Sequence, residues 1–367
     1  MRILLMSDVH LDAPFKWAKL EVARKRRQAL RDALARCVQI AIDQRVDVIC
    51  CGGDLFEHDR VSPDTGQFLR TQFERANPIP IYIAPGNHDW FGPESLYRRA
   101  RWSPNVHVFE DRKLTPVTLA DGLTLWGAAH CAPAGTPDFL KGFRVDRTGI
   151  HLALFHGSEL GSIYAEEEGK QQHAPFRASE IEASGLHFAL LGHYHTPRDE
   201  EHYTYPGNPE PLTFGESGVR GPVIATIGDD GLVTTDRHSV AISHVYDLEV
   251  DVGGCASKQE IRDRVAGALE GHGGYARVTL AGELAPDVDL HSLDFEDVGG
   301  SLESPPIIRF GSMTVAYDLA RIGQEATVRG QFIRDVQQSS ELAPDERQRV
   351  IVVGLRALEG RDDLEVF

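Results

Sequence analysis

Five short apolar segments of this 367-residue chain each end in aspartate, asparagine or histidine. The segments have the length and apolar content of buried strands, and helical patterns separate the first three. This β-α-β-α-β order predicts a parallel sheet with right-handed crossovers, and hence an α/β fold. Because functional groups in such sheets gather outside the carboxyl ends of the strands, we expect the five strand ends to lie close together.

The polar residues at these strand ends are of the types that bind metal ions. In chain order they are Asp8, His10, Asp54, Asn87, His88, Asp89, His156, His193 and His195. One such motif alone is equally consistent with a capped turn, which has a structural role only. The repetition at five strand ends favours a metal centre, because so many imidazoles and carboxylates at close quarters need positive charge among them. Mixed nitrogen and oxygen ligands suit manganese, iron or zinc.

In this order the motifs resemble those of the calcineurin-like metallophosphoesterases. The resemblance is carried by Asp8-Val9-His10, Gly53-Asp54, Gly86-Asn87-His88-Asp89, His156 and Gly192-His193-Tyr194-His195. It implies a layered αββα core that holds two divalent metal ions, most readily Mn²⁺. The implied ligand sets are Asp8, His10 and His195 for one metal and Asn87, His156 and His193 for the other, with Asp54 as the bridge.

The resemblance also implies a reaction, which is hydrolysis of a phosphoester by a hydroxide that two metals share. His88 is left over from the ligand set, and its implied role is that of a general acid or charge stabiliser at the leaving group. Asp89 is implied to orient His88. The other histidines, His58, His130, His173 and His202, are expected at the surface or beside the ligands.

Three features are similar to the SbcD-type DNA repair exonucleases. They are the sequence Gly53–Phe56, the sequence Tyr205–Asn208 followed by Phe214-Gly215-Glu216, and a small α+β domain followed by terminal helices. The resemblance implies DNA as the substrate, an SbcC-like coiled-coil ATPase bound through the C-terminal helices, and a possible homodimer. The sequence His10–Phe15 suggests a bacterial side branch of this group.

Two positions depart from the SbcD-type pattern. Asn208 replaces the usual serine, and Glu57 stands where some nuclease members carry a histidine that is associated with the exonuclease step. The polarity of any exonuclease activity is therefore left open.

The chain is longer than one compact core usually holds, which predicts more than one domain. We expect a metallophosphoesterase domain over 1–242, a small α+β capping domain over 243–312 and C-terminal helices that dock a partner over 313–367. Helical patterns cover 313–338 and 344–358. Residues 157–178, which include three glutamates at 166–168, predict an exposed loop near the site.

Charge is unevenly distributed along the chain. Residues 1–150 hold 21 Lys+Arg and 18 Asp+Glu, a balance of +3, whereas residues 151–367 hold 17 and 37, a balance of −20. The basic runs Arg24–Arg27 and Arg98–Arg101 follow two of the metal motifs, and they predict either phosphate contacts or solvated helix faces. The acidic second half keeps a small-molecule phosphodiesterase open as the alternative function. A scaffold without catalysis is a third reading, which the intact ligand set disfavours.

The sequence also bears on location. It shows no leader with an apolar core and no apolar run long enough to span a bilayer. The five cysteines lack disulfide or zinc-type spacing. We therefore expect a cytoplasmic protein without a membrane partner.

Overall fold

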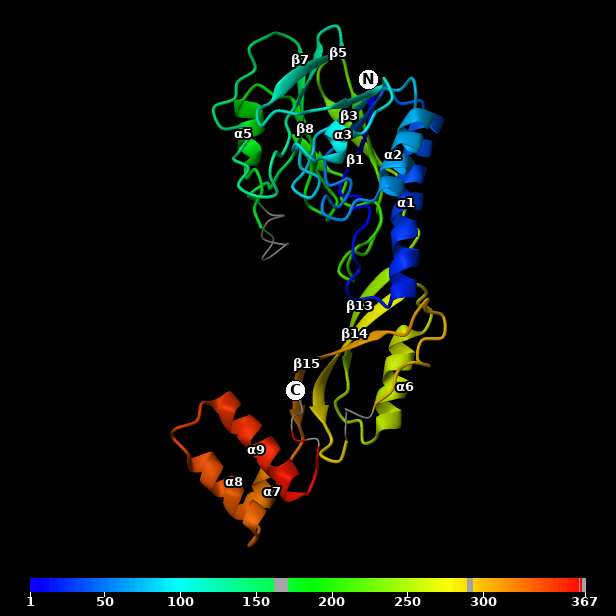
Figure 1. Cartoon of the computed structure of the whole chain (residues 1–367). Helices are drawn as coiled ribbons and strands as arrows, with labels where there is room; N and C mark the ends of the chain where they lie inside the picture. Colours follow the sequence, from blue (N-terminus) through cyan, green and yellow to red (C-terminus); the bar gives the residue numbers. More distant parts are fainter. Residues whose placement is uncertain (162–170, 289–292, 363, 365–367) are drawn as a thin grey trace. The chain divides into compact units, whose positions relative to one another are not determined.

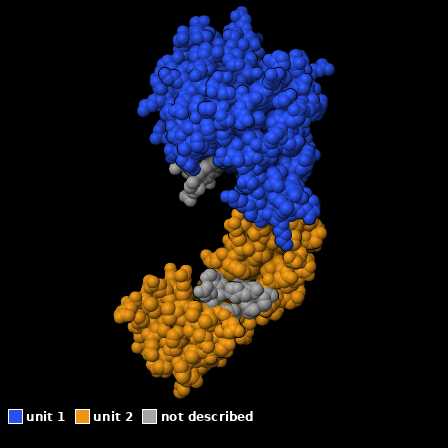
Figure 2. Space-filling model, viewed as in Figure 1, with its two compact units in different colours: residues 1–244 blue, residues 245–367 orange. Residues whose placement is uncertain are grey.

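The computed structural model describes residues 1–161, 171–288, 293–362 and 364 (Figure 1). The chain divides into two compact units, Met1–His244 and Val245–Phe367, which Figure 2 shows in different colours. The three glutamates at 166–168 of the predicted loop lie outside the described residues. The described part of that loop is not exposed throughout, because Ser158, Glu159, His173 and Phe176 are buried; the prediction of an exposed loop is wrong there.

The first sheet of the first unit has six strands in the order β12-β11-β1-β2-β3-β4. The strands are β1 (Arg2–Met6), β2 (Val48–Cys51), β3 (Ile81–Ile83), β4 (Val106–Val108), β11 (Val223–Ile227) and β12 (Val233–Arg237). β1 to β4 are parallel, whereas β11 and β12 form an antiparallel hairpin at the β1 edge. The parallel arrangement of β1, β2 and β3 confirms the predicted β-α-β-α-β opening.

The second sheet of this unit has the order β5-β6-β7-β8-β10-β9. Its strands are β5 (Thr115–Ala120), β6 (Leu123–Gly127), β7 (Ile150–His156), β8 (Phe188–Gly192), β9 (Arg198–Glu200) and β10 (Tyr203–Tyr205). β6, β7 and β8 are parallel, so their carboxyl ends lie at one edge.

The two sheets pack face to face. Ile3 and Leu5 of β1 belong to one buried cluster with Leu152 and Leu154 of β7. Because side chains alternate along a strand, the other residues of β1 point away from this interface. A sandwich of two sheets therefore forms the centre of the first unit.

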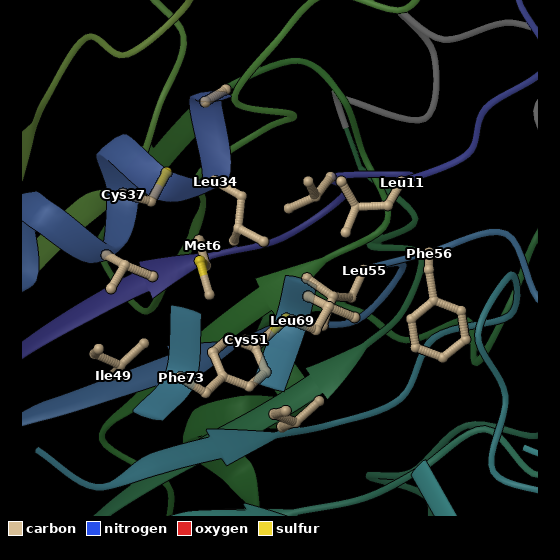
Figure 3. Packing of buried hydrophobic residues seen from close by; sticks show 14 of the residues in the cluster. Met6, Leu11, Leu34, Cys37, Ile49, Cys51, Leu55, Phe56, Leu69 and Phe73 are labelled. Atoms are coloured by element: carbon tan, nitrogen blue, oxygen red, sulfur yellow. The ribbon is translucent and has the colours of Figure 1, made fainter. Parts of the chain in front are cut away.

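Helices cover the outer face of each sheet. They are α1 (Leu20–Asp43), α2 (Pro63–Arg75) and α3 (Leu96–Arg99) beside the first sheet and α5 (Ala178–Ala183) beside the second. Met6 of β1 packs with Leu34 of α1 and Leu69 of α2 (Figure 3), and Phe155 of β7 packs with Ile181 of α5. The helix–sheet–sheet–helix order confirms the expected αββα core.

The second unit is a three-stranded parallel sheet followed by helices. It contains β13 (Val245–Asp251), α6 (Lys258–Leu269), β14 (Tyr275–Leu284), β15 (Ile307–Val315), α7 (Leu319–Gly323), α8 (Val328–Gln338) and α9 (Pro344–Leu358). α9 has the predicted bounds. The helix predicted from residue 313 is wrong at its start, because Met313 and Val315 alternate into the core as the end of β15. The predicted boundary at 312 falls inside this strand, and the separate roles of the two flanking segments stay predictions.

Among the described residues, the structure contains no helix with the length and apolar character needed to cross a membrane.

Candidate metal centre

The predicted site residues come together at the strand ends of the first unit. A cavity of about 730 Å³ is lined by six of them, His10, Asp54, Asn87, His88, His193 and His195. Asp8 and His156 lie behind the cavity and are fully buried. Because β1, β2 and β3 belong to one sheet and β7 and β8 to the other, the centre lies where the two sheets meet.

Glycines allow these strand ends to approach one another. A Cβ atom on Gly192 would lie 2.2 Å from the carbonyl oxygen of Gly52, which links the end of β8 to the end of β2. A Cβ atom on Gly86 would lie 2.2 Å from Oδ1 of Asp54. Atoms cannot approach that closely, so these glycines are required by the packing of the centre itself.

Four of the predicted ligand residues have backbone conformations that are uncommon for residues other than glycine. The φ angles are 54° at Asp8, 49° at His10, 51° at Asp54 and 119° at His193. Such conformations cost roughly 1–3 kcal/mol each and persist where the surrounding structure enforces them. Here the amide of Asp8 donates to Gly53 O at 2.9 Å and that of His10 to Asp54 O at 2.9 Å. The fold therefore holds these side chains at the cavity against a local conformational preference.

The first predicted ligand set is assembled as a group. One ligand atom each of Asp8, His10 and His195 lies within 4.8 Å of the others. His195 Nε2 is 4.0 Å from Asp8 Oδ1, and the rings of His10 and His195 are 5.2 Å apart between centroids. These separations leave room for a cation between the ligand atoms.

The second set also meets Asp54. His156 Nε2 is 3.1 Å from Asn87 Oδ1 and 3.3 Å from Asp54 Oδ2, and the rings of His156 and His193 are 5.2 Å apart between centroids. His10 Nε2, from the first set, is 3.7 Å from the same oxygen of Asp54. Asp54 thus stands between the two sets, where the bridge between the metals is predicted.

The imidazoles are held by their Nδ1 atoms. His10 Nδ1 contacts Glu57 Oε1 at 2.8 Å, His195 Nδ1 contacts Glu216 Oε1 at 2.8 Å, and His156 Nδ1 donates to Gly52 O at 2.8 Å. In each case Nε2 is left to face the carboxylates of the centre. A hydrogen bond at one ring nitrogen that orients the other is the usual arrangement around metal-binding histidines.

The cluster fits divalent cations on the chemistry of its own residues. His10 Nε2 is buried and has no hydrogen-bond partner among the described residues, and a lone pair in that position is suited to a metal. Asp8 and Asp54 place two carboxylates in a buried site beside imidazole nitrogens, the donor set of transition metals. The ligands do not select among manganese, iron and zinc.

The electrostatics of Asp54 agree with an ionised bridge. Burial raises the pKa of this carboxyl, but His156 and His10 outweigh it and hold the pKa well below its usual range. For Glu57, hydrogen bonds from His10 and His88 overcome burial and lower the pKa to about 2. Burial and the charge of Asp54 raise the pKa of Asp89 to about 6.

The contact that holds His88 differs from the predicted one. His88 Nδ1 pairs with Glu57 Oε2 at 3.0 Å. Asp89 instead accepts hydrogen bonds from the amides of Asp54, Leu55 and Gly86 and from the hydroxyl of Tyr97. The prediction that Asp89 orients His88 is therefore wrong: Asp89 is fully buried and joins the loops after β2 and β3, and Glu57 holds the ring of His88.

Two further histidines lie beside the ligands. His130 is buried, and its Nε2 contacts the carbonyl oxygen of His156 at 2.7 Å. His173 lines the cavity, with its ring 5.5 Å from that of His193. His130 comes three residues after β6 (Leu123–Gly127) and so shares the strand-end signal of the ligands, whereas His173 follows no strand end and had no such signal.

One of the two basic runs is not wholly available for phosphate. Arg26 is fully buried and pairs with Glu210, with 2.6 Å between Nη1 and Oε1, whereas its neighbours Arg24 and Lys25 are exposed. Lys16 is exposed at the cavity itself. Arg26 therefore cannot contact phosphate, and any positive charge offered to a substrate comes from other side chains.

Comparison with known proteins relates the chain to two curated relatives. It is 27% identical over 237 residues to the uncharacterized metallophosphoesterase YhaO of Bacillus subtilis, with 59% of this chain and 54% of that protein covered. It is 26% identical over 294 residues to the DNA double-strand break repair protein Mre11 of Methanopyrus kandleri, with 72% and 62% covered. The chain thus spans less than two thirds of the length of either relative.

A solved structure and a family model complete the comparison. The crystal structure of TT1561 of Thermus thermophilus is similar with a TM-score of 0.41 and 18% identity, over 64% of this chain and 98% of that one. The model of the calcineurin-like phosphoesterase family matches residues 1–197, more than half of the chain. The chain therefore belongs to the calcineurin-like phosphoesterase family.

Proposed function

We propose that this phosphoesterase hydrolyses phosphodiester bonds of DNA in the course of DNA repair. The observation that carries the hydrolytic part of the proposal is an exposed imidazole beside a buried ligand cluster. The side chain of His88 is 46% exposed in the cavity, whereas those of Asp8 and His156 are fully buried. A site of this kind holds cations on one side and offers a proton to a leaving group on the other.

The residues divide the reaction between them. Bound divalent cations supply positive charge to the phosphoryl oxygens and acidify water. The two predicted ligand sets would hold these cations, with Asp54 in contact with both sets. His88 has its Nδ1 engaged by Glu57, so Nε2 is the atom that donates a proton to the departing oxygen.

Support for DNA as the substrate comes from the relatives and from the cavity. The match to the Mre11 repair protein covers 72% of this chain, more than the 244 residues of the first unit supply, so it extends into the second unit. The cavity is lined by the partly exposed Trp17 and Trp90, and aromatic rings of this kind stack on bases. Lys16 adds a positive charge at the same rim.

We propose in addition that an SbcC-like coiled-coil ATPase docks on the C-terminal helices. α8 and α9 expose apolar side chains, with Val328 74%, Val353 38% and Leu358 47% exposed. An apolar helical surface suits packing against the helices of a coiled coil. The 367 residues contain no Gly-x-x-x-x-Gly-Lys-Ser/Thr loop, so ATP hydrolysis would belong to the partner. A homodimer is proposed on the resemblance alone.

A small-molecule phosphodiesterase is the second candidate. A cavity of about 730 Å³ is within the range of small-ligand sites, roughly 300–1,000 Å³. The balance of −20 over residues 151–367 also opposes a polyanion. Both observations concern the substrate and leave the hydrolytic chemistry unchanged.

Mn²⁺-dependent hydrolysis of end-labelled linear double-stranded DNA and of bis-p-nitrophenyl phosphate tests the proposal, with Asp54→Ala as the control. We expect both substrates to be cleaved and both activities to be lost in the variant. Cleavage of the small ester alone, also after addition of the candidate ATPase, would favour the small-molecule phosphodiesterase.

A further inference from the structure

We propose that the stacked rings of His58 and Trp90 bind the base of the leaving nucleotide, and that they bind it unpaired. The inference rests on the proposed function, because it takes DNA as the substrate and His88 as the proton donor. The imidazole of His58 and the indole of Trp90 are nearly parallel, with an interplanar angle of 26° and 4.3 Å between centroids. Both side chains line the cavity and are partly exposed. The pair therefore offers an aromatic surface inside the site.

The backbone places this aromatic pair beside the proton donor. The amide of His58 donates to the carbonyl oxygen of His88 at 2.9 Å, which joins the loop after β2 to the loop after β3. Trp90 follows His88 by two residues in the second of these loops. A nucleoside that leaves phosphorus and takes its proton from His88 therefore departs next to the stacked rings.

The position of the Trp90 indole is set by its surroundings. A Cβ atom on Gly92 would lie 2.0 Å from Cζ3 of Trp90, so the ring fills the space that a side chain at residue 92 would need. The amide of Phe91, between these two residues, donates to the carbonyl oxygen of His130 at 2.7 Å and holds the main chain. A ring that is held before the substrate binds loses little conformational freedom on stacking, which favours binding.

A second tryptophan of the cavity, Trp17, belongs to a different part of the site. Its Nε1 donates to the carbonyl oxygen of Leu212 at 3.4 Å. The amide of Leu212 donates to Oε2 of Glu216, and the other oxygen of Glu216 contacts the predicted ligand His195. Trp17 is thus connected to a metal-ligand segment, whereas the stacked pair is connected to the proton donor. The two aromatic positions are therefore expected to meet different nucleotides.

Stacking on the pair requires a base that has left the double helix. In a duplex, both faces of a base are covered by its neighbours, and unstacking costs least where the nucleotide is already single-stranded or mismatched. Aromatic side chains accept every base, because each base has a π-face. The site is therefore expected to accept a single-stranded or frayed end of any sequence in preference to a blunt duplex.

Three dinucleotides test this inference. They are d(ApA) and two analogues in which one adenine, on either the first or the second sugar, is replaced by hydrogen. The products of d(ApA) show which nucleoside departs without phosphate, and hence which analogue lacks the leaving base. Each dinucleotide is also tested as an inhibitor of bis-p-nitrophenyl phosphate hydrolysis, which reports binding even where no dinucleotide is cleaved.

The variants are Trp90→Ala, Trp90→Phe and His58→Ala, and two others serve for comparison. Trp17→Ala removes the other partly exposed tryptophan of the cavity, and Asp59→Ala removes an exposed carboxylate next to His58 that lines the same cavity. Mn²⁺ affinity by calorimetry and thermal melting are measured for every variant. We expect both to stay near the wild-type values, because the stacked rings are not among the predicted ligands.

In the wild type, loss of the leaving base should lower kcat/KM by about 5- to 150-fold, the range typical of a base stacked on one aromatic side chain. Trp90→Ala should show the lowered value with d(ApA) itself and lose little more when the leaving base is also absent. Trp90→Phe, which keeps a ring, should retain most of the dependence, and His58→Ala should retain part of it. Trp17→Ala and Asp59→Ala should keep the full dependence on the leaving base. A single-stranded oligonucleotide should be cleaved faster than its blunt duplex, and Trp90→Ala should reduce this difference.

A full dependence on the leaving base in Trp90→Ala would overturn the proposal, and so would a wild type that is indifferent to that base. If Trp90→Ala fails to fold or loses Mn²⁺ affinity, Trp90→Phe and His58→Ala carry the test. Dinucleotides that are not cleaved but inhibit hydrolysis of the small ester, through a base whose effect requires Trp90, would support the aromatic site and contradict the proposed cleavage of DNA. Dinucleotides that are neither cleaved nor inhibitory would overturn both.

Discussion

The buried pair of Arg26 and Glu210 gives the sharpest prediction of stability. Both side chains are fully buried, and 2.6 Å separates Arg26 Nη1 from Glu210 Oε1. The other oxygen of Glu210 accepts from the amide of Ile242 at 2.7 Å, and the guanidinium lies over the ring of Phe15 at 5.3 Å. Replacement of Arg26 by methionine removes the charge but retains an apolar side chain of similar length, and it leaves a carboxylate buried without its partner.

The size of the effect follows from this geometry. Breaking a buried pair by removing one partner costs about 3–5 kcal/mol of unfolding free energy. For a domain of 150–250 residues, 1 kcal/mol shifts the melting temperature by about 2–4 °C. Since the first unit has 244 residues, we expect Arg26→Met to lower its melting temperature by roughly 6–20 °C.

Differential scanning calorimetry measures this shift, and the double variant Arg26→Met/Glu210→Gln is the partner experiment. Neutralising Glu210 as well should restore part of the loss, because the remaining buried charge is the main source of the cost. Arg24→Met, at an exposed position of the same basic run, is the matched control and should melt within about 1 °C of the wild type, since surface substitutions usually change stability little. A shift below about 2 °C for Arg26→Met would show that the pair does not stabilise the unit as argued.

Three other predictions concern the centre itself. Asp54→Ala should lose its bound metal by elemental analysis, whereas His88→Ala should retain metal but lose turnover; loss of metal in His88→Ala would contradict this division of roles. Gly192→Ala should destabilise the first unit by about 1–3 kcal/mol in thermal melts, because the added Cβ would overlap Gly52 O. Gly215→Ala is the control and should leave stability nearly unchanged, because a Cβ at that position meets open space. Equal melting temperatures of the two variants would refute the packing argument. Removal of bound metal with a chelator should lower the melting temperature. Addition of Mn²⁺ at about 100 times its dissociation constant should then raise the free energy of unfolding by about 2.7 kcal/mol. A melting temperature that does not depend on Mn²⁺ would exclude binding to the folded state.

The predicted ligands could be found from the sequence because their signal is local. Each follows a strand within a few residues, and parallel strands bring their carboxyl ends to one edge whatever the rest of the chain does. His156 illustrates this, since it ends β7 and meets Asn87, which is 69 residues earlier in the chain. The β-α-β-α-β opening was predictable from local patterns as well, whereas the layered αββα core was expected from the family resemblance.

Contacts that depend on tertiary packing could not be predicted in this way. The partner of His88 proved to be Glu57 rather than its neighbour Asp89, because the segments after β1 and β2 run side by side. Arg26 was expected among solvated or phosphate-binding cations, but its partner Glu210 is 184 residues away and gives no local signal. The end of β15 was assigned to a helix, since a short alternating pattern is easily masked by the helical pattern that follows it.

The position of the centre between two sheets has a consequence for synthesis of the chain. Asp8, Asp54 and Asn87 come from the first half of the phosphoesterase unit, whereas His156 and His193 come from strands that leave the ribosome later. A nascent chain that ends before residue 150 contains the residues of β1 to β4 but carries only one of the four imidazoles that are predicted to bind metal. If the predicted ligands bind metal together, tight cation binding requires β7 and β8 to be in place, and the metal would then be acquired at the completion of the sandwich and not at its beginning.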